Sequence, residues 1–205
     1  MRLWTLQAPE VVATLRSTGN YRADWKLVTG NWCDAYRDMT AEMERRGVHC
    51  QGAPPIWCWP GRALRRGQVR SSARLLLSYP EWVHGRWLLK LDVPDELTLV
   101  TSYAAWNDYL GFTMGFQDGP EQMDWSGRRT SEWDELQVTI PELRSEWVVR
   151  ARPYPPDADT VAAIRADPDL RDEFARTRSP RSRRFFRATT SAGAVSTAPE
   201  SSSDT

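Results

Sequence analysis

Large and polar side chains alternate at the start of the chain. Residues 2–7, RLWTLQ, place Trp4 and Leu6 on one side of an extended backbone and the intervening side chains on the other. Pro9 suits the first position of a helix, and Gly19 is typical of the residue just past a helix end. The beginning of the chain therefore predicts a strand followed by a helix.

A helical period replaces this alternation between Asn31 and Gly47. Asn31 is a favourable N-cap, and Gly47 is a typical helix stop. The large apolar side chains between them recur at the spacing of one helix face; they are Trp32, Tyr36, Met39 and Met43. We expect an amphipathic helix that packs this stripe, Tyr36 included, against a sheet.

Two tryptophans flank a cysteine in residues 54–61, PPIWCWPG. Aromatic and β-branched side chains favour an extended backbone, and the prolines at both ends limit its length, so the pattern predicts a short or edge strand. Trp57 and Trp59 then share one side of the strand, and Ile56 and Cys58 share the other. The pattern leaves open which pair faces the core.

The remaining segments mix strand and helix patterns without a regular βα alternation or an internal repeat. The predicted elements are an exposed basic loop at 61–72, strands at 85–94 and 96–102, a helix from Tyr103 to near Gly111, a turn-rich lid or binding loop at 115–131, and, within 135–154, a strand, a helical turn beginning at Pro141 and a last strand.

These elements predict an α+β fold in a single compact domain, residues 1–155, with a small mixed or antiparallel sheet packed by helices. Residues 156–175 are compatible with a C-terminal helix. Residues 176–205 are rich in Ser, Thr, Pro and Arg, and they contain too few large apolar side chains to form a core, so we expect a disordered tail.

Composition and charge narrow the classes of protein. The chain has 205 residues, 40% of them hydrophobic, and a formal net charge of zero. Six arginines and two acidic residues in 176–205 leave a mildly acidic body, so nucleic-acid binding is expected only weakly, through the tail. No apolar run could span a membrane, the start lacks a signal-peptide pattern, and the three cysteines form no paired framework. A cytoplasmic protein is the expectation.

Strong catalytic and metal motifs are missing from the sequence, which has no GxGxxG, GxxxxGK[ST], HExxH, GxSxG or CxxC pattern. His49 and Cys50 with Cys58 could offer three zinc ligands, but their spacing matches no standard site. We therefore predict no metal site, and the sequence identifies no cofactor.

Several motifs in order resemble the bacterial domain-of-unknown-function 3841 family: LWTLQ near the start, AYRDM, PPIWCW, LLKLDVP before a helix with Trp106, and LQVTIPELRSEW. The resemblance covers about residues 2–154. Related sequences carry an LSDFDxWH-like segment where this chain reads LVTSYAAWN, so Tyr103 and Asn107 stand at the acidic and histidine positions. The family implies no activity.

The outline is also similar to compact ADP-ribosyltransferase-like domains. That resemblance implies a polar group on the first strand, Thr5 or Gln7, and an aromatic ring near the nicotinamide, Tyr36, Trp57 or Trp59. It also implies a late-strand group that stabilises the cationic sugar as nicotinamide leaves, at Glu135 or Gln137.

Three functions of different classes follow from these features. One is a small nucleotide- or NAD-binding domain with the transferase-like outline; the others are a non-catalytic binding module with an aromatic cleft for a small molecule or partner, and weak nucleic-acid association through the tail.

Overall fold

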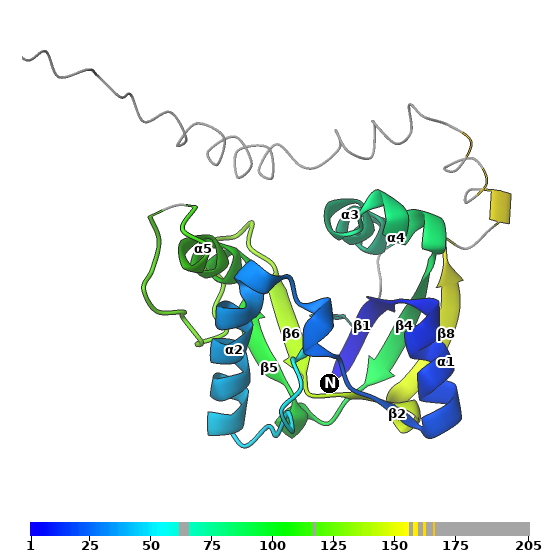
Figure 1. The fold of residues 1–205 in the computed structure, drawn as a ribbon, viewed down its shortest axis with the longest axis horizontal. Helices are drawn as coiled ribbons and strands as arrows, with labels where there is room; N and C mark the ends of the chain where they lie inside the picture. Colours follow the sequence, from blue (N-terminus) through cyan, green and yellow to red (C-terminus); the bar gives the residue numbers. More distant parts are fainter. Residues whose placement is uncertain (62–65, 117, 156–157, 160–161, 163–165, 167–205) are drawn as a thin grey trace, which may run out of the picture.

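One antiparallel sheet organises the part of the chain that the structure describes. The computed structural model describes residues 1–61, 66–116, 118–155, 158–159, 162 and 166. Six strands pair in the order β5-β6-β3-β1-β4-β8 (Figure 1). They are β1 (Arg2–Gln7), β3 (Ile56–Pro60), β4 (Arg86–Asp92), β5 (Leu99–Ser102), β6 (Leu136–Ile140) and β8 (Val148–Tyr154). A separate pair joins β2 (Asn20–Tyr21) to β7 (Leu143–Arg144).

Five α-helices accompany these strands in the described residues. They are α1 (Pro9–Thr18), α2 (Cys33–Arg45), α3 (Arg66–Leu76), α4 (Tyr79–His84) and α5 (Tyr103–Thr113). Helix α1 ends as its sequence predicts, because Gly19 adopts a left-handed φ of 82° and its N–H donates to the Leu15 carbonyl. The α+β class and the antiparallel sheet are confirmed.

One face of the sheet, here called the aliphatic face, is covered by α1. Val12 and Leu15 of α1 form one core with buried side chains of four strands of this sheet, namely Leu3, Ile56, Cys58, Leu89, Leu91, Val138 and Ile140. The structure thereby shows which side chains of β3 face the aliphatic core. Ile56 and Cys58 face it, and Trp57 and Trp59 point to the other side.

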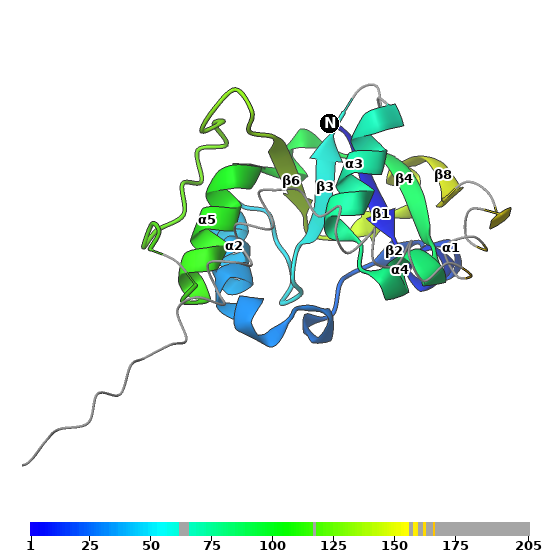
Figure 2. The same ribbon diagram turned by 90° about the horizontal axis from the view of Figure 1, so that it is seen from above.

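The opposite face is covered by two separate groups of helices. Helices α2 and α5 lie at the β5–β6 end, where Met39, Met43 and Trp106 are buried (Figure 1). Helices α3 and α4 lie toward the β4–β8 end, where Val69 packs against Trp4 and Leu88. Strand β3 runs between α3 and the α2/α5 pair (Figure 2). Its two tryptophans therefore join two apolar clusters.

The prediction of an exposed loop at 61–72 is wrong for residues 66–72, because α3 begins at Arg66, and residues 62–65 lie outside the described residues. Glycine and serines lower the helix propensity of this segment. Val69 and Ala73, however, lie one turn apart and are both buried, so tertiary packing outweighs the propensity. The sequence did contain a signal for α4: Ser78 and Glu81 form a capping box, in which the Glu81 carboxylate accepts from the Ser78 N–H at 2.8 Å.

Three local predictions also need correction. Strand β3 is short, as expected, but it is central and not at an edge. Helix α2 starts at Cys33, because Asn31 belongs to a preceding 3-10 turn. The helical turn expected at Pro141 comes later, at Ser145–Trp147, since Leu143–Arg144 first pair with β2.

Two expectations fall on residues that are mostly not described. The tail 176–205 lies outside the described residues, and so does most of the helix expected at 156–175. Among the described residues, no helix is long and apolar enough to cross a membrane.

Candidate functional site

The predicted site residues lie on two faces of the sheet. Thr5 and Gln7 belong to the aliphatic face, where Thr5 pairs across the strands with Leu89. The Thr5 hydroxyl donates to the Trp57 carbonyl at 2.8 Å and accepts from the Gln7 amide at 2.8 Å. These contacts join β1 to β3, so both side chains stabilise the pairing of these strands.

The two late-strand candidates differ in burial. Glu135 is exposed, and its main-chain carbonyl accepts from the Tyr103 N–H at 2.8 Å. Gln137 is only 2% exposed and points to the face opposite Thr5 and Gln7. The structure does not bring the residues of the ADP-ribosyltransferase-like outline into one pocket.

Five rings do come together, and we call them the aromatic face: Tyr36, Trp57, Trp59, Tyr103 and Trp106. The Trp57 ring lies 5.1 Å from Trp106, and the Trp59 ring lies 5.3 Å from Tyr103, centroid to centroid. The Trp57 indole N–H donates to the Tyr36 hydroxyl at 2.7 Å. Trp106 is buried, whereas the other four remain partly exposed. Three of the predicted ligand-binding residues therefore share this surface.

The phenols of this surface are neutral at physiological pH. Burial raises the pKa of Tyr36 to about 12, although the hydrogen bond from Trp57 opposes the shift. Burial also raises the pKa of Tyr103. The aromatic face thus offers rings and neutral hydrogen-bonding groups.

A transverse row of side chains crosses the sheet beside these rings; its members are Thr101, Gln137, Trp59, Trp4 and Lys90. Thr101 pairs with Gln137, and Trp4 pairs with both Trp59 and Lys90. The pairing of Cys58 with Val138 in the next position places Gln137 beside Trp59. Five neighbouring strands therefore each contribute one side chain to the row.

Three atoms in this row lack hydrogen-bond partners among the described residues. They are the Thr101 hydroxyl, the Gln137 amide nitrogen and the Trp4 indole nitrogen, on side chains that are 0%, 2% and 1% exposed. Buried polar groups are normally paired, and an unmade hydrogen bond costs about 1–3 kcal/mol. Three such groups in one row make this the part of the sheet where hydrogen bonding is least complete among the described residues.

A buried carboxylate positions the helix that carries Tyr103 and Trp106. Asp134 accepts from the Ser102 hydroxyl at 2.6 Å and from the Ala104 N–H at 2.9 Å, at the start of α5. Burial opposes its ionisation, but these hydrogen bonds and those from Thr130 hold the pKa of Asp134 below its usual value. Asp134 thus caps α5 electrostatically.

The buried thiols show no sign of reactivity. Burial raises the pKa of Cys50 to about 11 and also raises the pKa of Cys58, so both are protonated near neutral pH. His49 instead lies 2.7 Å from the Glu44 carboxylate. Within the described part of the chain, no group of three or more His, Cys, Asp or Glu side chains could hold a metal ion.

A second feature is an open pocket of about 510 Å³ between α2, α5 and the loop 121–125. Tyr109 and Trp125 form its aromatic wall, with ring centroids 6.5 Å apart. The Tyr109 hydroxyl donates to Asp38 at the rim, and this carboxylate adds to the effect of burial in raising the pKa of Tyr109.

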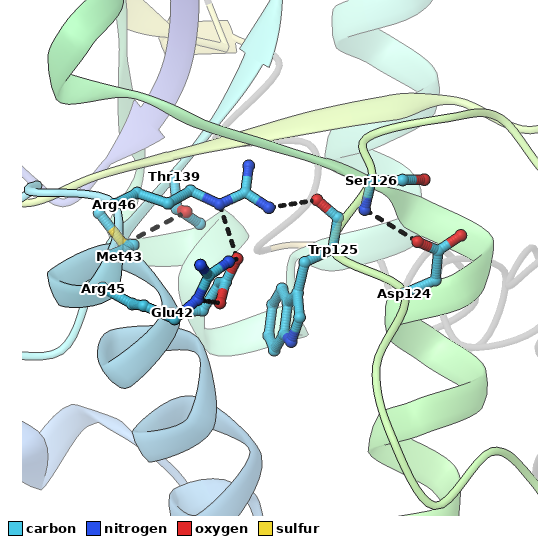
Figure 3. Close-up of polar contacts among 8 residues, drawn as sticks. All are labelled: Glu42, Met43, Arg45, Arg46, Asp124, Trp125, Ser126 and Thr139. Atoms are coloured by element: carbon cyan, nitrogen blue, oxygen red, sulfur yellow. Dashed lines mark hydrogen bonds and ion pairs between the residues drawn. The ribbon is translucent and has the colours of Figure 1, made fainter.

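Glu42 positions the arginine that connects α2 to the loop lining this pocket, as Figure 3 shows. Its carboxylate, only 7% exposed, accepts from Arg45 at 2.7 Å and from Arg46 at 2.6 Å. Arg46 also donates to the Trp125 carbonyl at 2.7 Å, which ties the loop to α2. One buried carboxylate therefore links the helix to the loop.

Sequence reasoning missed Trp4, Thr101 and Lys90 as neighbours of the predicted residues. The alternation of β1 did place Trp4 opposite Thr5, which was the available signal. The register that puts Trp4 beside Trp59 depends on strand order, which the sequence pattern does not contain.

Comparison with known proteins identifies one family. The family described as Domain of unknown function (DUF3841) matches residues 2–132, more than half of the chain. No curated protein and no solved structure shows significant similarity to the chain.

Identical substitutions at two buried threonines should have different effects on stability. Thr5→Val should lower the free energy of unfolding by about 1–2 kcal/mol, because it leaves the Trp57 carbonyl and the Gln7 amide without this partner. Thr101→Val should leave it unchanged or raise it by up to about 1 kcal/mol, because it removes an unpartnered hydroxyl. Urea unfolding of both variants measures the difference; equal losses would show that Thr101 has a partner.

The ion pairs of Glu42 should make stability depend on pH. Hydrogen bonds from Arg45, and then Arg46, lower the pKa of Glu42 against the effect of burial. Its stabilisation is therefore present above the ordinary value of 4.5 and is lost as the pH falls through the lower folded pKa. Glu42→Gln should cost about 1–2 kcal/mol at neutral pH and progressively less in acid.

Urea unfolding at a series of pH values tests this dependence, with Glu96→Gln, an exposed carboxylate on a 3-10 turn, as the control. A constant difference between wild type and Glu42→Gln across the acidic range would contradict the assignment.

Proposed function

Since the chain belongs to the family described as Domain of unknown function (DUF3841), which names no activity, we propose its function from the aromatic face. The protein binds a planar heteroaromatic small molecule between the α2/α5 pair and α3. The observation that carries the proposal is the transverse row, where three buried side chains with unpartnered polar atoms lie in line with a partly exposed tryptophan.

Ring stacking supplies the first part of the recognition. Trp57 and Trp59 come from a single central strand, so their backbone positions are fixed by pairing on both sides. Stacking of a base on an aromatic side chain contributes about 1–3 kcal/mol and tolerates different ring types. A rigid, partly exposed pair of tryptophans suits a flat ligand.

Hydrogen bonding supplies the second part. The Trp4 indole and the Gln137 amide nitrogen can only donate, and the Thr101 hydroxyl can donate or accept. A ligand that bears ring nitrogens or carbonyl oxygens matches these groups, whereas a plain hydrocarbon ring leaves them unpaired. The donors therefore favour a heteroaromatic ring such as a nucleobase.

Binding has more support than an ADP-ribosyltransferase-like reaction. That chemistry needs a carboxylate close to the ribose and the departing ring. Gln137 can form hydrogen bonds but carries no negative charge, and Glu135 is exposed. Thr5 and Gln7 lie on the aliphatic face, away from the rings. Nucleic-acid association through residues 176–205 has no support from the described residues.

Adenosine, uridine and nicotinamide are suitable first probes, and indole serves as a ring without acceptors. We expect at least one nitrogen-bearing probe to quench tryptophan fluorescence and raise the melting temperature of the full chain, because the ligand favours the folded state. Trp59→Leu should weaken that binding about tenfold, the order expected for one stacking contact.

Trp87→Leu is the matched control, because Trp87 is a partly exposed tryptophan that packs on the aliphatic face instead. Its affinity for the same probe should stay within about twofold of wild type. The proposal fails if none of the probes binds at millimolar concentration, if indole binds as well as they do, or if the two leucine variants lose affinity equally.

A further inference from the structure

The open pocket between α2, α5 and the loop 121–125, here called the loop pocket, is separate from the aromatic face. None of the five rings of the aromatic face is among the described residues that line it. Its volume of about 510 Å³ lies within the range of small-molecule sites, about 300–1,000 Å³. The loop pocket is therefore a second candidate binding site.

Acidic side chains outnumber basic ones in the lining of the loop pocket. Asp38, Glu42 and Glu121 face it, against one arginine, Arg45, among the described residues. Glu42 is already engaged, because its carboxylate accepts three hydrogen bonds from Arg45 and Arg46 at 2.6–2.7 Å. With Arg46 included, these side chains carry a net charge of −1. The negative charge that is left without a partner belongs to Asp38 and Glu121.

These two carboxylates reach the pocket from different elements, since Asp38 lies on α2 and Glu121 lies on the loop. Neither forms an ion pair with a described residue. The Tyr109 hydroxyl donates to one oxygen of Asp38, so the second oxygen remains available. Both carboxylates can therefore accept hydrogen bonds from a bound cation.

The aromatic wall of the pocket also suits a positive charge. The Trp125 ring is partly exposed and lies edge-on to Tyr109, with an interplanar angle of 67°. The hydrogen bond from Arg46 fixes the Trp125 carbonyl, and Figure 3 shows the indole on the side of the loop that faces α2. Among aromatic side chains, tryptophan attracts cations most strongly. Ring and carboxylates together favour an organic cation.

The chemistry of the lining favours a guanidinium over an ammonium. A guanidinium is flat, so it can stack on the Trp125 ring while its N–H donors point outwards, in its own plane, to carboxylates. An ammonium is a compact charge that holds its water more strongly. Since the loop pocket is open to solvent, the cation that is more weakly hydrated gives up less on binding.

We propose that the loop pocket binds a guanidinium group, stacked on Trp125 and hydrogen-bonded to Asp38 and Glu121. This chemistry is available from a guanidinium compound outside the chain and from the chain itself, because residues 178–187 contain five arginines. Such a segment complements the charge of the mildly acidic body. The inference does not rest on the proposed function, because the two sites share no residue.

Ligand-observed NMR titrations of the full chain with butylguanidinium, butylammonium and the uncharged analogue butylurea test the site. Butylguanidinium should bind at least about fivefold more tightly than the other two, because it alone combines a positive charge with a flat group of paired donors. Its affinity should fall as sodium chloride is raised, because salt screens the exposed carboxylates.

Trp125→Leu should weaken the binding of butylguanidinium about fivefold, and Glu121→Gln about threefold, through loss of the cation–π contact and of one exposed charge. Trp133→Leu and Glu96→Gln are the matched controls. Trp133 is 72% exposed and does not line the pocket, and Glu96 is an exposed carboxylate on a 3-10 turn. Both controls should stay within about twofold of wild type, and melting temperatures without ligand check the folding of all four variants.

Replacement of the five arginines in residues 178–187 by glutamine, within the full chain, distinguishes the two sources of the ligand. A severalfold rise in butylguanidinium affinity identifies these arginines as the occupant, and an unchanged affinity assigns the pocket to a guanidinium from outside the chain.

Three results overturn the inference. They are the absence of butylguanidinium binding at millimolar concentration, binding of butylurea or butylammonium that is equally tight, and equal losses of affinity in the pocket variants and their controls. Each of these results leaves the aromatic face and its nitrogen-bearing probes unaffected, because that site has different residues and different ligands.

Discussion

The pairing of β1 with β3 is the constraint on which the rest of the structure depends. These two strands occupy the middle of the sheet, and the Thr5 hydroxyl bonds directly to the Trp57 carbonyl between them. Both faces of the sheet are covered, so a shift of one residue in register would exchange aliphatic for aromatic side chains on every covered surface. The single register that buries Leu3 against α1 also sets Trp4 against Trp59.

The two faces differ in how completely their polar groups are paired. On the aliphatic face the Gln7 amide donates to the Thr5 hydroxyl, which in turn donates to the Trp57 carbonyl, and the surrounding core is apolar. On the opposite face Thr101, Gln137 and Trp4 retain unpartnered atoms, although apolar side chains at those positions would avoid the cost. A stability cost confined to one row, next to partly exposed rings, is the pattern expected where binding constrains the sequence.

Local patterns in the sequence were sufficient for most elements and insufficient for the site. Alternation and a left-handed glycine predict β1 and α1 because each depends on neighbouring residues alone. Helix α3 was missed because its buried Val69 and Ala73 are explained only by Trp4 and Leu6, far away in sequence. The family match likewise ends at residue 132, yet β6 and β8 complete the sheet, and β6 carries Gln137. Which side chains meet depends on strand order.

The chemistry of the aromatic face favours recognition over bond cleavage. Its phenols are held neutral by burial, and the buried Cys58 thiol, protonated for the same reason, points to the aliphatic face. The transverse row contains no carboxylate, thiol or imidazole. Asp134, a buried carboxylate at the start of α5, already accepts several hydrogen bonds. General acid–base catalysis needs a group that can exchange a proton near neutral pH. Among the described residues this surface supplies rings and neutral donors, groups that suit the proposed binding and not proton transfer.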